Sequence, residues 1–262
     1  MNKSLKILAL LFAGLLVLSF VVGCSSEKST QENQEGNTND PEYQAAQTEA
    51  VTQVEYSIDN MASGMTYISG FVPPESSFTT TDTSYYGYDD ISGWWYFYAN
   101  GDSANFSATT ADSIRFTAGE THQENPDSTT DKMEFRLYLN LYASDTSGSA
   151  SMDYLNDWTY TGLNTDTLQI NGNGSYEWAM AVNDHNYYVN MSEQFDSIRW
   201  VIGSLYPFAG VLSLSMTANY LDENYAGQIT DWDFTITFYE DHYHAYASNG
   251  TYYWEWDFYY GT

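Results

Sequence analysis

The residues best suited to chemistry lie near the end of the chain, in Glu240-Asp241-His242-Tyr243-His244. In a strand, alternate side chains point to one face, so His242 and His244 would share a side. Two imidazoles and a carboxylate are ligands that transition metals accept. No further ligand pair in the sequence is spaced to complete such a site. We therefore expect no required cofactor and keep a divalent cation at Asp241, His242 and His244 as an alternative.

The sequence carries no other recognisable catalytic grouping. It has no Gly-x-Ser-x-Gly motif, and its single cysteine, Cys24, lies close to the start of the chain. Asp and Glu together number 35, so no one pair of carboxylates stands out for glycoside hydrolysis. We therefore predict a non-enzymatic binding or interaction module, with a hydrolase that uses acidic residues as an alternative.

Aromatic residues are the strongest remaining indication of function, with 8 Trp, 25 Tyr and 13 Phe. In a β-protein they could simply fill the core and pair across neighbouring strands. If the strands form a barrel or half-barrel, a cavity could instead hold a lipid or another apolar ligand. Exposed Tyr138, Tyr142, Tyr253 and Tyr259 would favour carbohydrate binding by stacking on sugars. The residues predicted to line an apolar site are Phe135, Trp178, Trp200, Trp232, Trp254 and Trp256.

From Tyr67 onward, short runs of alternating apolar and polar residues predict strands. In the run from Met133 to Tyr142, apolar and polar side chains fall on opposite faces. Short connections predict antiparallel pairing. The sequence thus predicts an all-β domain with about a dozen antiparallel strands in a barrel, half-barrel or sandwich. Turns are predicted at Asn100-Gly101, Asn171-Gly172, Asn173-Gly174 and Asn249-Gly250.

The β-domain, residues 67–262, contains an internal repeat, which predicts a duplicated sheet unit. The two copies span about residues 85–178 and 172–260. In the repeated motif the Ile and the final aromatic residue should point inward, leaving Arg115 and Arg199 on the polar face beside carboxylates. The matching segments are Asp112-Ser113-Ile114-Arg115-Phe116 with Asp196-Ser197-Ile198-Arg199-Trp200, Asp157-Trp158 with Asp231-Trp232, and Asn173-Gly174-Ser175-Tyr176-Glu177-Trp178 with Asn249-Gly250-Thr251-Tyr252-Tyr253-Trp254.

The first 23 residues have the features of a secretion signal, with Lys3 and Lys6 before an apolar run and no acidic residue. The run ends in Val21-Val22-Gly23-Cys24, which resembles the lipobox of bacterial lipoproteins. The resemblance implies that Cys24 is lipidated and anchors the protein to a membrane of the cell envelope. In a diderm bacterium, Ser25 after the cysteine, rather than Asp, favours the outer membrane, on its periplasmic or surface face.

Residues 24–40 are predicted to form a disordered tether because they lack aromatic and aliphatic side chains that could support a core. Residues 41–66 are then predicted to contain one amphipathic helix, from about Pro41 to Ala62. Val51, Val54, Ile58, Met61 and Met65 recur there at helical spacing. This helix would cover an open end or face of the sheet, or alternatively would plug a cavity.

The net charge of the chain limits the classes of molecule that it can bind. Lys3 and Lys6 are lost with the signal peptide, so the mature chain keeps five of the seven basic residues against 35 acidic ones. Such a chain repels phosphate backbones, which excludes nucleic acid as a partner. An apolar small molecule or an envelope protein remains a candidate partner, and the oligomeric state is left open. A further alternative is an outer-membrane β-barrel component, because Tyr252-x-Trp254-x-Trp256-x-Phe258-x-Tyr260 resembles the final strand of such barrels.

Overall fold

The structure, a computed structural model, describes residues 34–35, 51–52, 54–59, 61, 84–182, 185–220 and 228–260. The predicted signal peptide, Cys24, most of the predicted tether and both ends of the predicted helix lie outside these residues. No helix among the described residues is long and apolar enough to span a membrane.

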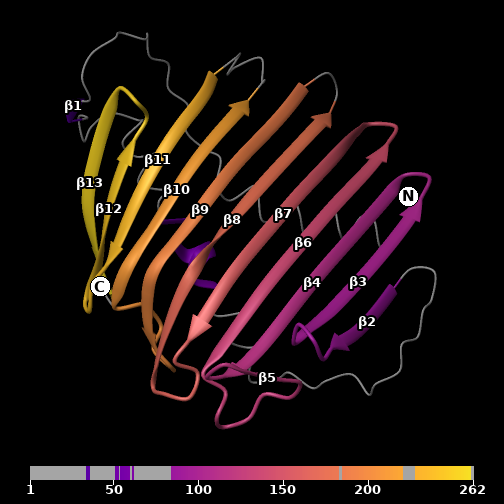
Figure 1. The fold of residues 1–262 in the computed structure, drawn as a ribbon. Helices are drawn as coiled ribbons and strands as arrows, with labels where there is room; N and C mark the ends of the chain where they lie inside the picture. Colours follow the sequence, from indigo (N-terminus) through magenta and orange to yellow (C-terminus); the bar gives the residue numbers. More distant parts are fainter. Residues whose placement is uncertain are drawn as a thin grey trace.

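The described strands form one open sheet of 13 strands (Figure 1). Nearly all neighbours along the sheet are also neighbours in sequence, and they pair antiparallel. The predicted all-β, antiparallel fold is confirmed. Because β2 and β1 lie at opposite ends and do not pair with each other, the closed barrel is wrong, and the single sheet also excludes the sandwich.

The strand order along the sheet is β1-β13-β12-β11-β10-β9-β8-β7-β6-β4-β3-β2, with β5 paired to β4. The bounds are β1 Gln34–Glu35, β2 Ser84–Asp89, β3 Trp94–Ser103, β4 Phe106–Ala118, β5 Thr121–Gln123, β6 Lys132–Asp145, β7 Gly148–Thr161, β8 Thr167–Val182, β9 His185–Val201, β10 Ala209–Tyr220, β11 Gln228–Phe238, β12 His242–Ser248 and β13 Tyr252–Tyr259.

One of the four predicted Asn-Gly turns is confirmed. Gly250 has a φ of 80°, and the Asn249 backbone N–H donates to the carbonyl of Tyr252 between β12 and β13. Asn100-Gly101 lies instead inside β3, and Asn171-Gly172 and Asn173-Gly174 lie inside β8. These three turn predictions are wrong because strand pairing outweighs the local turn preference. Asn100 and Gly101 pair with β4, and the two Asn-Gly pairs of β8 lie between β7 and β9.

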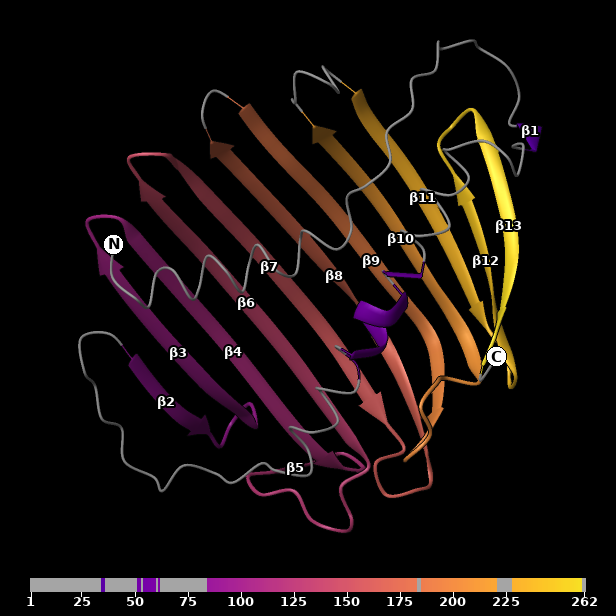
Figure 2. The ribbon, with the colours of Figure 1, turned by 180° about the vertical axis from the view of Figure 1, so that it is seen from behind.

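A helix packs against the apolar face of the sheet near its middle (Figure 2). Residues 51, 52, 54–59 and 61 are helical, within the predicted span. Val54, Ile58 and Met61 are buried in the main core, so the predicted apolar stripe is the one that docks. The Tyr160 hydroxyl of β7 also donates to the Met61 carbonyl at 3.4 Å. The helix therefore covers a face of the sheet, as the simpler of the two predictions required.

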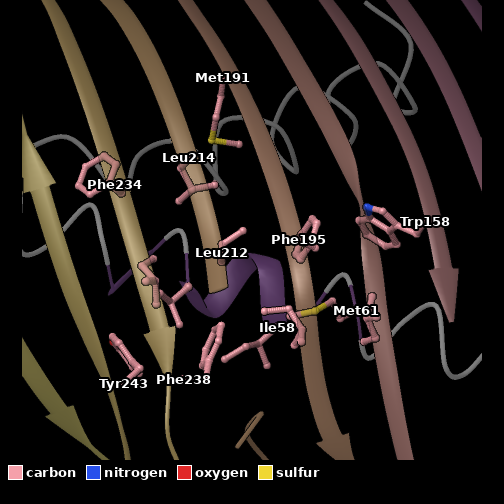
Figure 3. Close-up of a cluster of buried hydrophobic side chains, with 14 of the residues drawn as sticks. Ile58, Met61, Trp158, Met191, Phe195, Leu212, Leu214, Phe234, Phe238 and Tyr243 are labelled. Carbon is pink, nitrogen blue, oxygen red and sulfur yellow. The ribbon is translucent and has the colours of Figure 1, made fainter. Parts of the chain in front are cut away.

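The apolar face beneath the helix is filled by aromatic and aliphatic side chains from several strands (Figure 3). The Trp158 and Phe195 rings meet edge to face, with centroids 5.5 Å apart. Ile58 and Met61 of the helix lie among the same side chains. Each large apolar side chain buried in this way contributes about 1.5–3 kcal/mol.

Shortening Ile58 is expected to loosen this contact modestly. Ile58→Val removes one buried methylene, which should lower the free energy of unfolding by about 0.5–1.5 kcal/mol. Urea titration of the full chain, followed by tryptophan fluorescence, measures this loss. The control Asp59→Asn alters an exposed residue of the same helix and should change the free energy of unfolding by less than about 0.5 kcal/mol. Equal effects of the two changes would contradict docking through Ile58.

The two copies of the repeated motif lie in β4 and β9 and differ in one respect. Ile114 and Phe116, like Ile198 and Trp200, are buried as predicted. In β9, however, Ser197 has a φ of 53° and the register with β10 shifts between Ala209 and Val211. A bulge adds one residue to one strand and turns the preceding side chains to the other face. Asp196 is therefore exposed, whereas Asp112 is half-buried.

Part of the predicted tether pairs with the sheet. Gln34–Glu35 form β1, which lies parallel to the start of β13 at Tyr252 and Tyr253. This is the one parallel pair in the described sheet. The remaining tether residues lie outside the described part of the chain.

Candidate functional site

The polar face of the sheet carries a continuous row of hydrogen-bonding side chains. The row runs across β3, β4, β6, β7, β8, β9, β10 and β11, and each member is the direct register partner of the next. With about 4.8 Å between strands, it extends roughly 34 Å. We call it the polar row, and its members are Asn100, Thr109, Asn140, Asp153, Glu177, Asn190, Thr217 and Asp231.

Hydrogen bonds between neighbouring strands orient several members of the row. Asn140 Nδ2 donates to Asp153 Oδ1 at 2.6 Å, and Thr217 Oγ1 donates to Asp231 Oδ1 at 2.9 Å. Asn190 Nδ2 donates to Glu177 Oε1 at 3.3 Å. Asp153 and Glu177 lie side by side on β7 and β8, with the two amides on their outer sides. Like charges directly opposite destabilise a sheet, so this pair favours a partner that donates hydrogen bonds.

Tyrosines border the polar row on both sides. Tyr138 and Tyr142 each lie two residues from Asn140 on β6, and Tyr188 lies two residues before Asn190 on β9. Because side chains alternate along a strand, all three share the face of the row. Their exposed fractions are 38%, 44% and 38%. Small residues separate Tyr142 from Tyr188 in the register, namely Ser151 and Ala179.

The four tyrosines proposed from sequence for sugar stacking separate into two places. Tyr138 and Tyr142 border the polar row, whereas Tyr253 and Tyr259 lie on β13 near the opposite edge of the sheet. Tyr259 is exposed, and Tyr253 is half-buried against Tyr246, with ring centroids 5.8 Å apart. The structure thus brings together only the first pair. Tyr188 was not identified from sequence, because its proximity to the row depends on strand register.

The predicted metal ligands lie on and beside β12, where His242 and His244 share one face. His242 Nδ1 lies 2.7 Å from Asp241 Oδ1, and His244 Nδ1 lies 2.9 Å from Asp257 Oδ1. The hydrogen bond from His242 lowers the pKa of the Asp241 carboxyl. The His242 ring also stacks between Tyr239 and Tyr259. Within the described ranges, no group of three His, Cys, Asp or Glu side chains is arranged to hold a metal ion.

The six residues predicted to line an apolar site all lie in one buried cluster on the face that the helix covers. Trp232 and Trp254 contact each other, with ring centroids 5.3 Å apart. The Trp200 indole N–H donates to the Ser204 carbonyl at 2.9 Å. The structure therefore places these residues among core side chains. The cluster includes Phe135, Trp178, Trp200, Trp232, Trp254 and Trp256.

Three of the four Lys and Arg residues that the structure describes cluster near Trp94 on the polar face. The Arg115 and Arg136 guanidiniums lie over the Trp94 ring at 4.7 and 4.6 Å from its centroid. Arg115 pairs with Glu134 at 2.6 Å, and Lys132 reaches the same carboxylate at 3.2 Å. Burial opposes ionisation of Glu134, but hydrogen bonds from both cations lower its pKa. The predicted pairing of Arg115 is confirmed, whereas Arg199 lies over the Phe208 ring at 5.3 Å.

A buried acid on the apolar face was missed by the sequence analysis. Glu193 of β9 is 5% exposed and lies opposite Gly174 of β8 and Leu214 of β10. Ser57 of the helix donates to Glu193 Oε2 at 3.5 Å, and Glu193 Oε1 has no hydrogen-bond partner among the described residues. The sequence feature that could have identified it is the alternation in β9. Glu193 occupies the inward position between Met191 and Phe195, where an apolar residue is expected.

Asn156 lies next to Glu193 across Gly174. Its Oδ1 and Glu193 Oε1 each lie 2.4 Å from the point that a Cβ on Gly174 would occupy, and in the described part of the chain neither oxygen has a hydrogen-bond partner. Asn156 Nδ2 donates to the Tyr154 hydroxyl at 2.5 Å. Both oxygens are acceptors while Glu193 is ionised, so neither can satisfy the other. Burial raises the pKa of Glu193 to about 7, which the hydrogen bond from Ser57 only partly opposes.

Tyrosines complete the surroundings of Glu193. Burial raises the pKa values of Tyr154 and Tyr160, and the nearby Glu193 carboxylate adds to this effect. Burial raises the pKa of Tyr176 to about 12, with a further contribution from Tyr56 of the helix. No basic side chain forms an ion pair with Glu193 among the described residues. The buried acid therefore lies among hydroxyl, amide and apolar groups at the contact between helix and sheet.

Comparisons with family models, curated proteins and solved structures gave no match to this chain.

Proposed function

We propose that the protein is a lipid-anchored cell-envelope binding module of non-enzymatic type, whose binding surface is the polar face of the sheet around the polar row. The observation that carries this proposal is the register of the row, which aligns hydrogen-bonding side chains across neighbouring strands beside exposed tyrosines. Ordered polar groups of this kind give orientation and specificity, and exposed aromatic rings give contact area.

The polar face supports binding better than the apolar face does. The helix side chains Val54, Ile58 and Met61 are packed into the apolar cluster, so an apolar ligand there would have to displace the helix. The polar row needs no such rearrangement. Attachment through Cys24 would hold the protein at a membrane of the cell envelope, which is the outer membrane if the bacterium is diderm.

The anchor is tested by labelling cells with an alkyne fatty acid during expression of the full chain. We expect the wild-type protein to be labelled and to fractionate with membranes, because lipidation requires the Cys24 thiol. Cys24→Ser should lose the label and remain unprocessed. A wild-type chain without label would overturn the anchor.

The binding surface is tested with the lipidated full chain in liposomes, sedimented with envelope fragments of the producing bacterium. Tyr138→Ala and Tyr142→Ala should lower co-sedimentation at least fivefold. The control Tyr259→Ala removes another exposed tyrosine of the same face, 54% exposed but outside the row, and should bind as the wild type does. Equal binding by all the variants would overturn the assignment of the binding surface.

A further inference from the structure

We infer that the polar row binds an extended, neutral glycan chain that lies across the strands. This inference rests on the proposed function and specifies its ligand class. The row is straight in register from β3 to β11, so a linear polymer can meet successive members without bending around the molecule. Its length of roughly 34 Å spans several sugar rings.

The chemistry of the row matches sugar hydroxyls. Amide, hydroxyl and carboxylate groups all occur along it, supplying both donors and acceptors. The carboxylates Asp153 and Glu177 accept only, so together they call for donors from the ligand. A sugar ring offers hydroxyl donors at its rim and an apolar C–H face for the rings of Tyr138, Tyr142 and Tyr188. The two kinds of contact lie two residues apart along the same strands, as a single chain of sugars requires.

The charge of the protein selects among glycans. The chain carries a formal net charge of −28, and the row itself includes three carboxylates, Asp153, Glu177 and Asp231, and no cation. A polyanionic glycan would be repelled at every step along the row. A neutral polymer avoids this repulsion and exchanges its hydroxyl–water contacts for contacts with the row.

A cationic protein is the competing partner for an acidic face. Protein interfaces depend on a packed apolar centre with a few large anchors. Leu155, 44% exposed beside Tyr138, is a single large apolar side chain next to the row and does not form a packed centre. The other neighbours of the row at the centre of this face are mostly small and polar, including Ser151, Ser175, Ser192 and Ser215. The tyrosines border the row instead of forming a central cluster. These features favour the glycan.

The test is affinity electrophoresis of the lipidated full chain in gels that contain one polysaccharide each, with a detergent that carries no sugar. The neutral probes are hydroxyethyl cellulose, xylan, mannan and glycol chitin in its N-acetylated form, and the polyanionic probe is alginate. We expect at least one neutral polymer to retard the protein, also in 0.5 M NaCl, and alginate to leave its mobility unchanged. Tyr142→Ala and Asn140→Ala should weaken the retardation at least tenfold, whereas Tyr259→Ala should not.

Three outcomes would overturn the inference. The first is that no neutral polymer retards the protein, and the second is that Tyr259→Ala weakens retardation as much as Tyr142→Ala does. The third is that the protein binds only to a polycation, such as a polylysine-coated resin, and that salt abolishes this binding. If the envelope binding described above persists with its dependence on Tyr142 but disappears when the fragments are treated with protease, the glycan fails while the proposed function stands. Absence of the fatty-acid label on Cys24 would overturn only the proposed lipid anchor and would leave the assignment of the binding surface unchanged.

Discussion

Replacing Glu193 with glutamine is expected to remove a pH dependence from the stability of the protein. The folded-state pKa of Glu193, about 7, lies above its ordinary value of 4.5, so the folded protein holds a proton that the unfolded chain has released between these pH values. The contribution of Glu193 to the free energy of unfolding is therefore fully present below pH 4.5, is lost as pH rises from 4.5 to 7, and does not change further above pH 7. Integrated over this window, the loss is roughly 3 kcal/mol.

The glutamine variant isolates this contribution from that of the other acidic residues. Glu193→Gln keeps the shape of the side chain and still accepts from Ser57. Urea titrations between pH 4.5 and 8 should show the variant gaining stability relative to the wild type by roughly 3 kcal/mol as pH rises. A constant difference across this range would contradict a buried, protonated Glu193.

Glu134 provides the control with the opposite sign. Its pKa is lowered in the folded protein by Arg115 and Lys132, so it contributes stability that is present above its unfolded pKa and is lost as pH falls. Extended below pH 4.5, the titrations should show the wild type gaining stability relative to Glu134→Gln as pH rises to 4.5. Above pH 4.5 this difference should stay constant, while the wild type loses stability relative to Glu193→Gln. The two series together show whether the trend belongs to the site or to the net charge of the protein.

Gly210→Ala is expected to lower the free energy of unfolding by about 3 kcal/mol or more. Gly210 has a φ of 109°, a conformation that alanine adopts only with strain. A Cβ there would also lie 2.5 Å from Ile198 Cα and 2.6 Å from the Ser197 carbonyl oxygen. Both are backbone atoms of the β9 bulge, so relief requires movement of the strand and not rotation of a side chain.

A second glycine inside a strand provides the control for this substitution. Gly101 of β3 has no atom within 4 Å of the corresponding Cβ position and does not have a positive φ. Gly101→Ala should change stability by less than about 1 kcal/mol. Urea titrations of both variants measure the difference. A Gly210→Ala protein as stable as Gly101→Ala would show that the bulge is not tightly packed against β10.

The sequence by itself determined the local features of the fold. Alternation of apolar and polar residues assigned the two faces of the sheet, so the inward positions of Phe135 and Trp254 and the outward position of Arg115 agree with it. The helical spacing of Val54, Ile58 and Met61 identified the stripe that docks. These predictions succeeded because the period of the side chains follows from the backbone conformation of one segment.

The tertiary structure decided what depends on contacts between segments. Asn173-Gly174 has the composition of a turn, yet it lies inside β8 because β7 and β9 pair with it on both sides. The motif shared by β4 and β9 begins with Asp in both copies. Asp112 is half-buried and Asp196 is exposed, because only the β9 copy contains a bulge. Whether the sheet closes was left open by the sequence, since closure depends on the pairing of the two end strands.

The candidate sites also depend on contacts between segments that are distant in the sequence. The polar row exists only because the register of eight strands aligns residues from Asn100 to Asp231, and a shift of one residue in any strand would turn its member to the other face. Glu193 is a buried acid because the helix covers it, and this contact joins segments that lie far apart in the sequence. Local periodicity is encoded within each segment, whereas register and burial are set by partners distant in the chain, and so only the folded sheet determines them.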